Sequence, residues 1–305
     1  MNTSTFRLAF FALVATIASS QFTLAGPNVT QFDVPGSIYT APLGINNAGD
    51  IVGTYVDSQG RSHGFLRKAN GAYTTIDPSG STLTQAIGIN EHGQIVGTWA
   101  DSSGFFGHAF VFDGTAFQFP EVPGWRGTQG TDISNSGILV GNYFDFEGSS
   151  ATRGFTMNGG LVTTYAPTGT TLSEAFGVNS AGDVVGFFRD STGSGNHGYL
   201  YSGGTYTILD VAGSTLTAAS DVNELGTIVG SFYENGQPHG FAYSNGTYNV
   251  YDFPGQTTTN LTAINDFGIV TGHANGHGFI GSVDQPQSAT PEPTSWVIAV
   301  LGVFT

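Results

Sequence analysis

A ten-residue motif recurs along this chain and constrains its fold more than any other feature. It reads GINNAGDIVG at residues 44–53 and returns five more times with the same turn and closing glycine. The copies begin at Gly44, Gly88, Asp132, Gly177, Asp221 and Ala263. Self-similarity at a fixed period is the sequence signature of a repeat architecture.

Each repeat has the length and pattern of four short strands. The closing glycines of the motif follow one another in steps of 42 to 45 residues, and a turn glycine precedes each by 17. In the second repeat the predicted strands are residues 84–89, 95–99, 108–112 and 116–119. They are rich in β-branched and aromatic residues and are bounded by Gly, Pro, Asn or Asp. Four strands in about 44 residues match one blade of a β-propeller.

The two ends of the repeat region complete each other. The last repeat has a third strand at residues 277–280 but no fourth, whereas NVTQFDVPG at residues 28–36 parallels NVYDFPG at 249–255. A terminal strand that joins the last blade would close the ring and remove exposed sheet edges. The sequence therefore predicts an all-β, six-bladed β-propeller of four-stranded blades over residues 27–284. Its sixth blade is closed by the N-terminal strand, Val29–Val34.

The composition narrows the choice of partners. The chain has 22 acidic and 7 basic residues, a formal net charge of -15, and no cysteine. The negative charge disfavours nucleic acid and anionic membranes and suits cations or neutral glycans. Without cysteine there is no thiol catalysis and no cysteine-ligated zinc. No cofactor is predicted.

Both ends of the chain are predicted to direct export and sorting. Residues 1–25 have one basic residue, an apolar run and a small-residue cleavage site, which is typical of a signal peptide. At the other end, residues 285–290 (QPQSAT) have the composition of a linker. Membrane contact is expected only through the export segment and the C-terminal segment, and the mature protein is expected to be extracellular or at the cell surface.

The C-terminal segment, residues 291–305, resembles the PEP-CTERM sorting signal of bacteria that make exopolysaccharide. Pro291, Glu292 and Pro293 match the motif of that family, and Trp296 opens the apolar stretch that follows. The stretch, Trp296–Phe304, is short for a membrane span, and no Lys or Arg follows it. The resemblance is therefore to a truncated or degenerate form of the signal.

The repeats themselves resemble the bacterial HAF extracellular repeat. The resemblance rests on the Asn-x-x-Gly turn, the Val-Gly strand and a His-Gly-Phe or related tripeptide. The tripeptides begin at His63, His108, Arg153, His197, His239 and His277. The family implies an extracellular location and no established chemistry.

Two polar positions recur in nearly every repeat. An acid follows five of the six closing glycines by four residues, at Asp57, Asp101, Asp145, Asp190 and Glu234, whereas Gly276 breaks the series in the sixth repeat; the histidines form the second series. The acids suit cation or sugar binding, but Asp-Ser-x-Gly is also a good Asx turn. The histidines suit metal ligation or acid–base chemistry. However, each precedes by two residues an aromatic on the same face of its strand, which predicts a core-edge histidine bonded to a neighbouring loop. We favour the structural interpretation of both series, and no metal site is predicted.

Departures from the repeat gather in the third unit. Trp125 has no counterpart elsewhere, Arg153 replaces the histidine, and Asp145 and Glu147 lie close together in the loop between them. Loop residues outside the repeat pattern often serve binding. These four residues are therefore the predicted ligand-binding set, and no catalytic residue is predicted.

The predicted function is that of a non-catalytic, secreted or surface-associated propeller that binds a glycan or a protein in the extracellular matrix. No nucleophile elbow, phosphate loop or zinc-binding helix occurs in the chain. The alternative is a secreted polysaccharide hydrolase or lyase that uses carboxylates on the loop face of the propeller. An enzyme of this kind needs an asymmetric cluster of groups, whereas the recurring acids and histidines are nearly symmetric.

Overall fold

The computed structural model describes residues 29–144, 152–192, 195–252 and 258–283. Every regular element in these ranges is a β-strand, so the predicted all-β class is confirmed. Within them there is no helix that could span a membrane. The predicted signal peptide, linker and sorting segment lie outside the described residues.

The strands fall into successive groups of four, here called the first to sixth units. The first three units are β2 (Ser37–Ile45), β3 (Ile51–Asp57), β4 (Ser62–Arg67), β5 (Tyr73–Ile76); β6 (Leu83–Ile89), β7 (Ile95–Ala100), β8 (Phe106–Phe112), β9 (Phe117–Gln118); and β10 (Gly127–Ile133), β11 (Leu139–Phe144), β12 (Arg153–Asn158), β13 (Leu161–Tyr165). The fourth and fifth are β14 (Thr170–Val178), β15 (Val184–Asp190), β16 (Asn196–Ser202), β17 (Thr205–Leu209); and β18 (Leu216–Val222), β19 (Ile228–Glu234), β20 (Gln237–Ser244), β21 (Thr247–Tyr251). The sixth is β22 (Asn260–Ile264), β23 (Ile269–Ala274), β24 (His277–Ser282) together with β1 (Thr30–Phe32).

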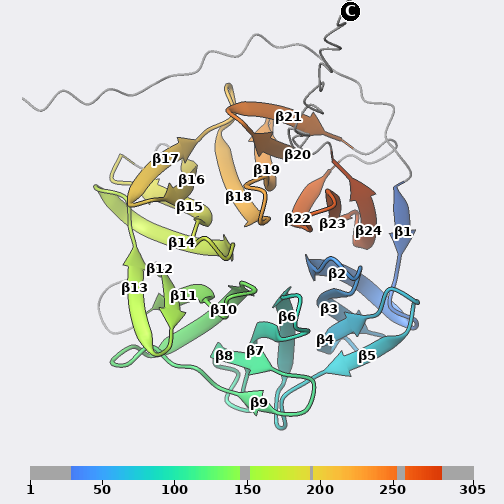
Figure 1. Ribbon diagram of the computed structural model, residues 1–305. Coiled ribbons are helices and arrows are strands. Elements are labelled where there is room, and N and C mark those ends of the chain that lie inside the picture. The colour runs from blue at the N-terminus through green and yellow to red at the C-terminus, as the bar shows by residue number, and fades with distance from the viewer. Residues whose placement is uncertain (1–28, 145–151, 193–194, 253–257, 284–305) are drawn as a thin grey trace, which may run out of the picture.

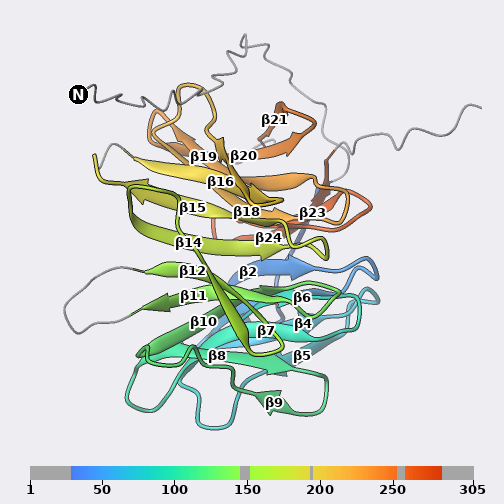
Figure 2. The ribbon, with the colours of Figure 1, turned by 60° about the vertical axis from the view of Figure 1, so that its left-hand side comes forward.

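Strands within a unit pair antiparallel with their neighbours in sequence. Single parallel bridges, Ser62 to Leu83 and Asn196 to Leu216, join the first unit to the second and the fourth to the fifth. The units are arranged around a central axis, with the first strand of each innermost and the fourth outermost (Figure 1). From the side, β14 and β15 lie over β10–β12, so successive sheets pack face to face (Figure 2). This arrangement is propeller-like.

The N-terminal strand joins the sheet formed by the last strands of the repeat region. β1 pairs antiparallel with β24, with Thr30 opposite Ile280 and Phe32 opposite Gly278. This is the partner strand that the sequence predicts for residues 28–36. The guanidinium of Arg67, in the first unit, lies 5.1 Å from the Phe32 ring centroid, so β1 also contacts the first unit.

The closing glycine of the motif is required by close packing inside each unit. A Cβ on Gly97 would lie 2.0 Å from the carbonyl oxygen of Gln85 and 2.7 Å from the ring of Phe110. Phe110 is buried, as are its counterparts at the same repeat position. These counterparts are Phe65, Phe155, Tyr199, Phe241 and Phe279. The aromatic that follows each histidine is therefore core, as predicted.

Candidate functional site

The recurring histidines are bound to carboxylates of their own unit. In four units the Nδ1 atom lies within hydrogen-bonding distance of an aspartate at the end of the fourth strand. The pairs are His63–Asp77 (2.6 Å), His197–Asp210 (2.8 Å), His239–Asp252 (2.9 Å) and His277–Asp33 (2.9 Å). The sequence predicts that each histidine bonds to a neighbouring loop, and the partner in these four units is the Asp just before the turn that leads to the next unit. The sequence analysis did not identify this Asp.

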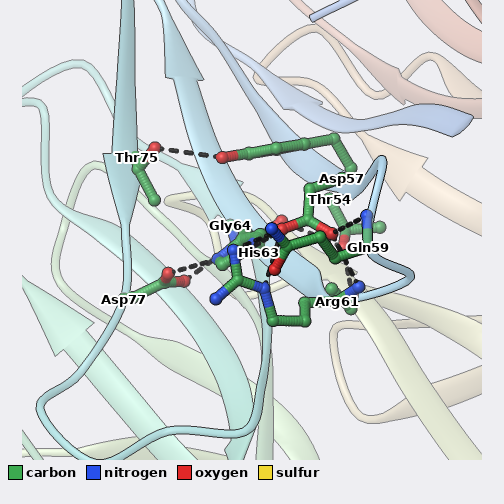
Figure 3. Close-up of polar contacts among 10 residues, drawn as sticks. Thr54, Asp57, Gln59, Arg61, His63, Gly64, Thr75 and Asp77 are labelled. Carbon is green, nitrogen blue, oxygen red and sulfur yellow. Dashed lines mark hydrogen bonds and ion pairs between the residues drawn. The ribbon is translucent and has the colours of Figure 1, made fainter. Parts of the chain in front are cut away.

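The first unit shows how these side chains form a structural cluster (Figure 3). The ring of His63 lies between Asp77 and Asp57, and it stacks on Tyr55 at a centroid distance of 5.1 Å. Asp57 accepts hydrogen bonds from the backbone N–H groups of Gln59 (2.8 Å) and Arg61 (2.9 Å). These bonds hold the pKa of Asp57 well below its usual range, and the bond from the Arg61 backbone has the largest effect. Asp57 thus closes an Asx turn, which supports the structural interpretation of this series.

The third unit lacks this cluster. Arg153 stands at the histidine position, and Ala166 stands at the position of the aspartate partner. The Arg153 Nη1 atom donates hydrogen bonds to the backbone carbonyls of Thr152 (3.1 Å) and Thr171 (3.0 Å). The guanidinium therefore bridges the third unit to the first strand of the fourth.

Two of the four predicted ligand-binding residues, Trp125 and Arg153, lie next to the same residue, Tyr143. The Trp125 ring lies 4.4 Å from that of Tyr143, and it is 39% exposed. Arg153 is the cross-strand neighbour of Tyr143 in the β11–β12 pairing. Asp145 and Glu147 lie outside the described residues.

A cavity of about 340 Å³ lies on the central axis and is the strongest candidate site. It is lined by the first strands of all six units and by the Asn turns that follow them in every unit but the fourth. Its volume falls in the range of small-molecule pockets. Neither Trp125 nor Arg153 lines it, nor do the recurring histidines.

The wall of the cavity departs from the repeat. At the first motif position the six units carry Gly44, Gly88, Asp132, Gly177, Asp221 and Ala263, and all of these except Gly177 line the cavity. At the preceding position they present Leu43, Ile87, Thr131, Phe176, Ser220 and Thr262. Apolar side chains therefore face the cavity from the first, second and fourth units, and carboxylates from the third and fifth.

Asp132 and Asp221 approach one short segment of the fourth unit. The backbone N–H of Val178 donates to Asp132 Oδ2 at 3.0 Å, and a Cβ on Gly177 would lie 2.9 Å from Asp221 Oδ1. Asp221 also accepts from the backbone N–H groups of Val222 (2.7 Å) and Ile264 (2.9 Å). Each carboxylate thus connects its own unit to the next while remaining at the cavity wall.

The two carboxylates are electrostatically coupled. Burial raises the pKa of Asp132 to about 6. Burial, and after it the charge of Asp132, raises the pKa of Asp221 well above its ordinary value. Among the residues lining the cavity in the described part of the chain there is no Lys, Arg or His. The negative charge at the axis is therefore not balanced by a basic side chain of the cavity wall.

A belt of hydrogen bonds encircles the axis at the Asn turns. Five of the units contribute to it the variable residue that follows the motif Asn or Ser. The bonds run from Asn47 N to Glu91 Oε1 (2.8 Å), Glu91 N to Asn135 Oδ1 (2.9 Å), Asn135 Nδ2 to Glu224 Oε1 (3.0 Å), Glu224 N to Asp266 Oδ1 (2.9 Å) and Asp266 N to Asn47 Oδ1 (2.9 Å). The last of these joins the sixth unit to the first. The belt sets polar groups around one end of the cavity.

Sequence reasoning missed Asp132 and Asp221 because it treated them as members of the motif. The available signal was the alignment of the six copies, in which these two positions carry a carboxylate where the others carry Gly or Ala. A charged residue at a position otherwise reserved for the smallest side chains indicates a local role rather than a role in the repeat.

No protein-family model matches the sequence, and no curated protein matches it. Among solved structures, TolB from Acinetobacter baumannii has a TM-score of 0.54 at 12% identity, over 77% of this chain and 64% of that one. The Hadza microbial sialidase Hz136 has a TM-score of 0.50 at 14% identity, over 81% and 66%. An Aleuria aurantia lectin mutant in complex with Fucα1-6GlcNAc has a TM-score of 0.46 at 14% identity, over 86% and 99%. At such identities the first two similarities support the propeller-like fold alone.

Proposed function

We propose that this protein is a non-catalytic, six-bladed β-propeller that binds an extracellular glycan at its central axis. In this proposal each four-stranded unit is one blade, and β1 closes the ring as the outer strand of the sixth. The β1–β24 pairing supports closure, as do the bonds that join Asp266 and Asn47 across the first and last units.

The observation that carries the binding role is the asymmetric axial cavity. Its acidic and amide side chains offer hydrogen-bonding groups suited to hydroxyls, and Leu43, Ile87 and Phe176 offer an apolar wall. Two exposed apolar residues, Leu225 and Phe267, follow Glu224 and Asp266 on the same turns. Apolar surface beside a few oriented polar groups is the usual composition of a small-ligand site.

We infer from the predicted export and sorting segments that this activity takes place outside the cell. The predicted signal peptide at residues 1–25 and the resemblance of residues 291–305 to a PEP-CTERM signal support a secreted or surface-associated protein. The HAF-like repeats support the same location. Deletion of residues 291–305 is expected to change the fraction retained at the surface, and unchanged fractionation would contradict a sorting role.

A glycan array with three proteins tests the binding site. Wild type is expected to retain a defined set of glycans, and Ser220→Phe, which places a bulky ring at the cavity wall, is expected to lose them. Trp125→Ala is expected to keep them, because Trp125 does not line the cavity. Loss with Trp125→Ala and retention with Ser220→Phe would move the site to the third unit. A protein that binds no glycan would contradict the proposal, leaving a protein partner as the next class to test.

The coupled carboxylates favour one rival, a polysaccharide hydrolase or lyase. Paired acids near one another can serve as general acid and base. Burial raises the pKa of both groups. Release of reducing ends that disappears in Asp132→Asn or Asp221→Asn would establish this rival. Release that instead disappears in an Asp145→Ala, Glu147→Ala double variant would place the chemistry in the third unit.

A further inference from the structure

We propose that the axial cavity binds a protonated primary amine, held between Asp132 and Asp221, with the rest of the ligand against the apolar wall. This inference rests on the proposed function and specifies the group of the ligand that enters the cavity. The negative charge of the chain suits both cations and neutral glycans, and this inference distinguishes between these two classes of ligand.

The first argument is the shape and chemistry of the cavity. A volume of about 340 Å³ accommodates a single sugar residue or a molecule of similar size. Leu43, Ile87 and Phe176 give it an apolar side, whereas Thr131, Asp132, Ser220 and Asp221 give it a polar one. A ligand that matches both sides has a compact body with one strongly polar end.

The second argument fixes the sign of that polar end. Glu91, Asp132, Asp221, Glu224 and Asp266 all line the cavity, and its wall includes no basic side chain among the described residues. Like charges in a poorly solvated site repel one another strongly. A cation placed between Asp132 and Asp221 relieves this repulsion, whereas a neutral hydroxyl does not.

The third argument favours an organic cation over a metal ion. In the part of the chain that the structure describes, no three carboxylate or imidazole groups converge closely enough to ligate one ion. Asp132 and Asp221 also accept backbone hydrogen bonds, from Val178 and from Val222 and Ile264. Divalent ions require more oxygen ligands than this pair provides. An ammonium group needs only a few acceptors around its three N–H donors.

The acid pair also predicts how binding responds to pH. Because the pKa values of both groups are raised, the acid pair holds a proton before the ligand binds. Binding of an ammonium group favours the charged form of the pair, so this proton is released to the buffer. Glu224 and Asp266 add to this effect, since their charges act on Asp132 and Asp221 respectively. Binding should therefore weaken as the pH falls from 7.5 to 5.0.

Isothermal titration calorimetry of the mature protein with matched ligands tests the proposal. D-glucosamine is compared with N-acetyl-D-glucosamine, and 2-phenylethylamine with 2-phenylethanol. At least one amine is expected to bind at least about tenfold more tightly than its neutral partner, with a heat that varies with the ionisation enthalpy of the buffer. Preference for glucosamine would identify a glycan as the source of the amine, and preference for phenylethylamine a small molecule.

Three variants separate charge from structure. Asp221→Asn and Asp132→Asn preserve the size of the side chain and one acceptor oxygen, which serves the bond from Val178 to residue 132 and one of the two backbone bonds to residue 221. Each is expected to weaken amine binding at least about tenfold. Glu121→Gln removes an exposed carboxylate outside the cavity and is expected to leave binding unchanged. Unfolding curves of all three confirm that the proteins compared are folded.

Three results would overturn the proposal. They are equal affinity of each amine and its neutral partner, no detectable binding of either amine, and complete displacement of the amine by 1 mM Ca²⁺ or Mg²⁺. The first would leave glycan binding at the axis intact and remove only the ammonium group. Loss of all glycan binding on the array would instead remove the proposed function itself.

Discussion

The histidine–aspartate pairs, here called the rim, and the wall of the axial cavity use the same repeat in opposite ways. At the rim, four units present the same histidine bound to the same aspartate, at 2.6 to 2.9 Å. At the axis, one motif position carries Gly in three units, Ala in another and a carboxylate in two. The difference teaches that a residue present in each unit serves the unit, whereas a residue that breaks the pattern is available for a single task.

The third unit supports this lesson from the other direction. Arg153 replaces the histidine, and Ala166 replaces its aspartate partner, so both members of the pair are absent together. Loss of one partner alone would leave the other without its hydrogen bond. Paired replacement is what a structural contact requires, and it supports the structural interpretation of the histidine–aspartate pairs.

The largest effect is expected at the repeated core. Gly97→Ala places a Cβ 2.0 Å from the Gln85 carbonyl oxygen and against the Phe110 ring, and it should cost at least about 3 kcal/mol of unfolding free energy. Gly93→Ala is the control, because Gly93 has a φ of 75° but open space around its Cβ position. It should cost about 1 kcal/mol, from backbone strain alone. Equal losses in urea denaturation would contradict the packing account.

The next effect is expected at the axis and depends on pH. The pKa of Asp132 is higher in the folded chain, about 6, than its ordinary value of 3.8, so the folded state binds the proton more tightly. Its contribution to stability is complete below pH 4 and is lost as the pH rises through 6. Asp132→Asn avoids this loss, and the variant should be more stable than wild type by about 3 kcal/mol at pH 8.

Urea denaturation of both proteins from pH 4 to pH 8 measures this difference. The advantage of Asp132→Asn should vanish at pH 4, where the wild-type carboxyl is neutral. A constant difference across the range would show that the substitution acts through packing and not through charge.

A smaller loss is expected when a rim histidine is removed. His63→Ala breaks the 2.6 Å contact with Asp77 and the stacking on Tyr55, and it should cost about 1.5 kcal/mol. Amine and glycan binding should be unchanged, because His63 does not line the cavity. A loss of binding in a folded His63→Ala protein would assign the rim a role in recognition.

The smallest effect is expected from restoring the repeat in the third unit. Arg153→His combined with Ala166→Asp installs the histidine–aspartate pair found elsewhere. In a double-mutant cycle the two substitutions should be coupled favourably by about 0.5 to 1 kcal/mol. Additive effects would mean that the paired replacement at these positions is coincidental.

Much of the fold could be predicted from the sequence because its local signals agree with one another. The spacing of the closing glycines gave the length and number of the repeats. The similarity of residues 28–36 to residues 249–255 predicted the partner of β1. The buried aromatic two residues after each histidine followed from strand alternation. These features depend on contacts within one unit or between neighbours, which a repeated sequence displays several times.

The candidate site could not be found in the same way. Asp132 and Asp221 are 89 residues apart and are brought together only by the arrangement of the units around the axis. Trp125 and Arg153 do lie at one tyrosine, but Trp125 packs on it and Arg153 binds backbone carbonyls. The sequence shows that these residues are unusual without showing which of the unusual residues share a cavity.

The most direct test of the account is a crystal structure of the protein soaked with D-glucosamine or 2-phenylethylamine, whichever binds more tightly in solution. The account predicts density for the ligand in the axial cavity, with its amino group within hydrogen-bonding distance of both Asp132 and Asp221. Density beside Trp125 or at the histidine–aspartate pairs of the rim, with an empty axis, would contradict it.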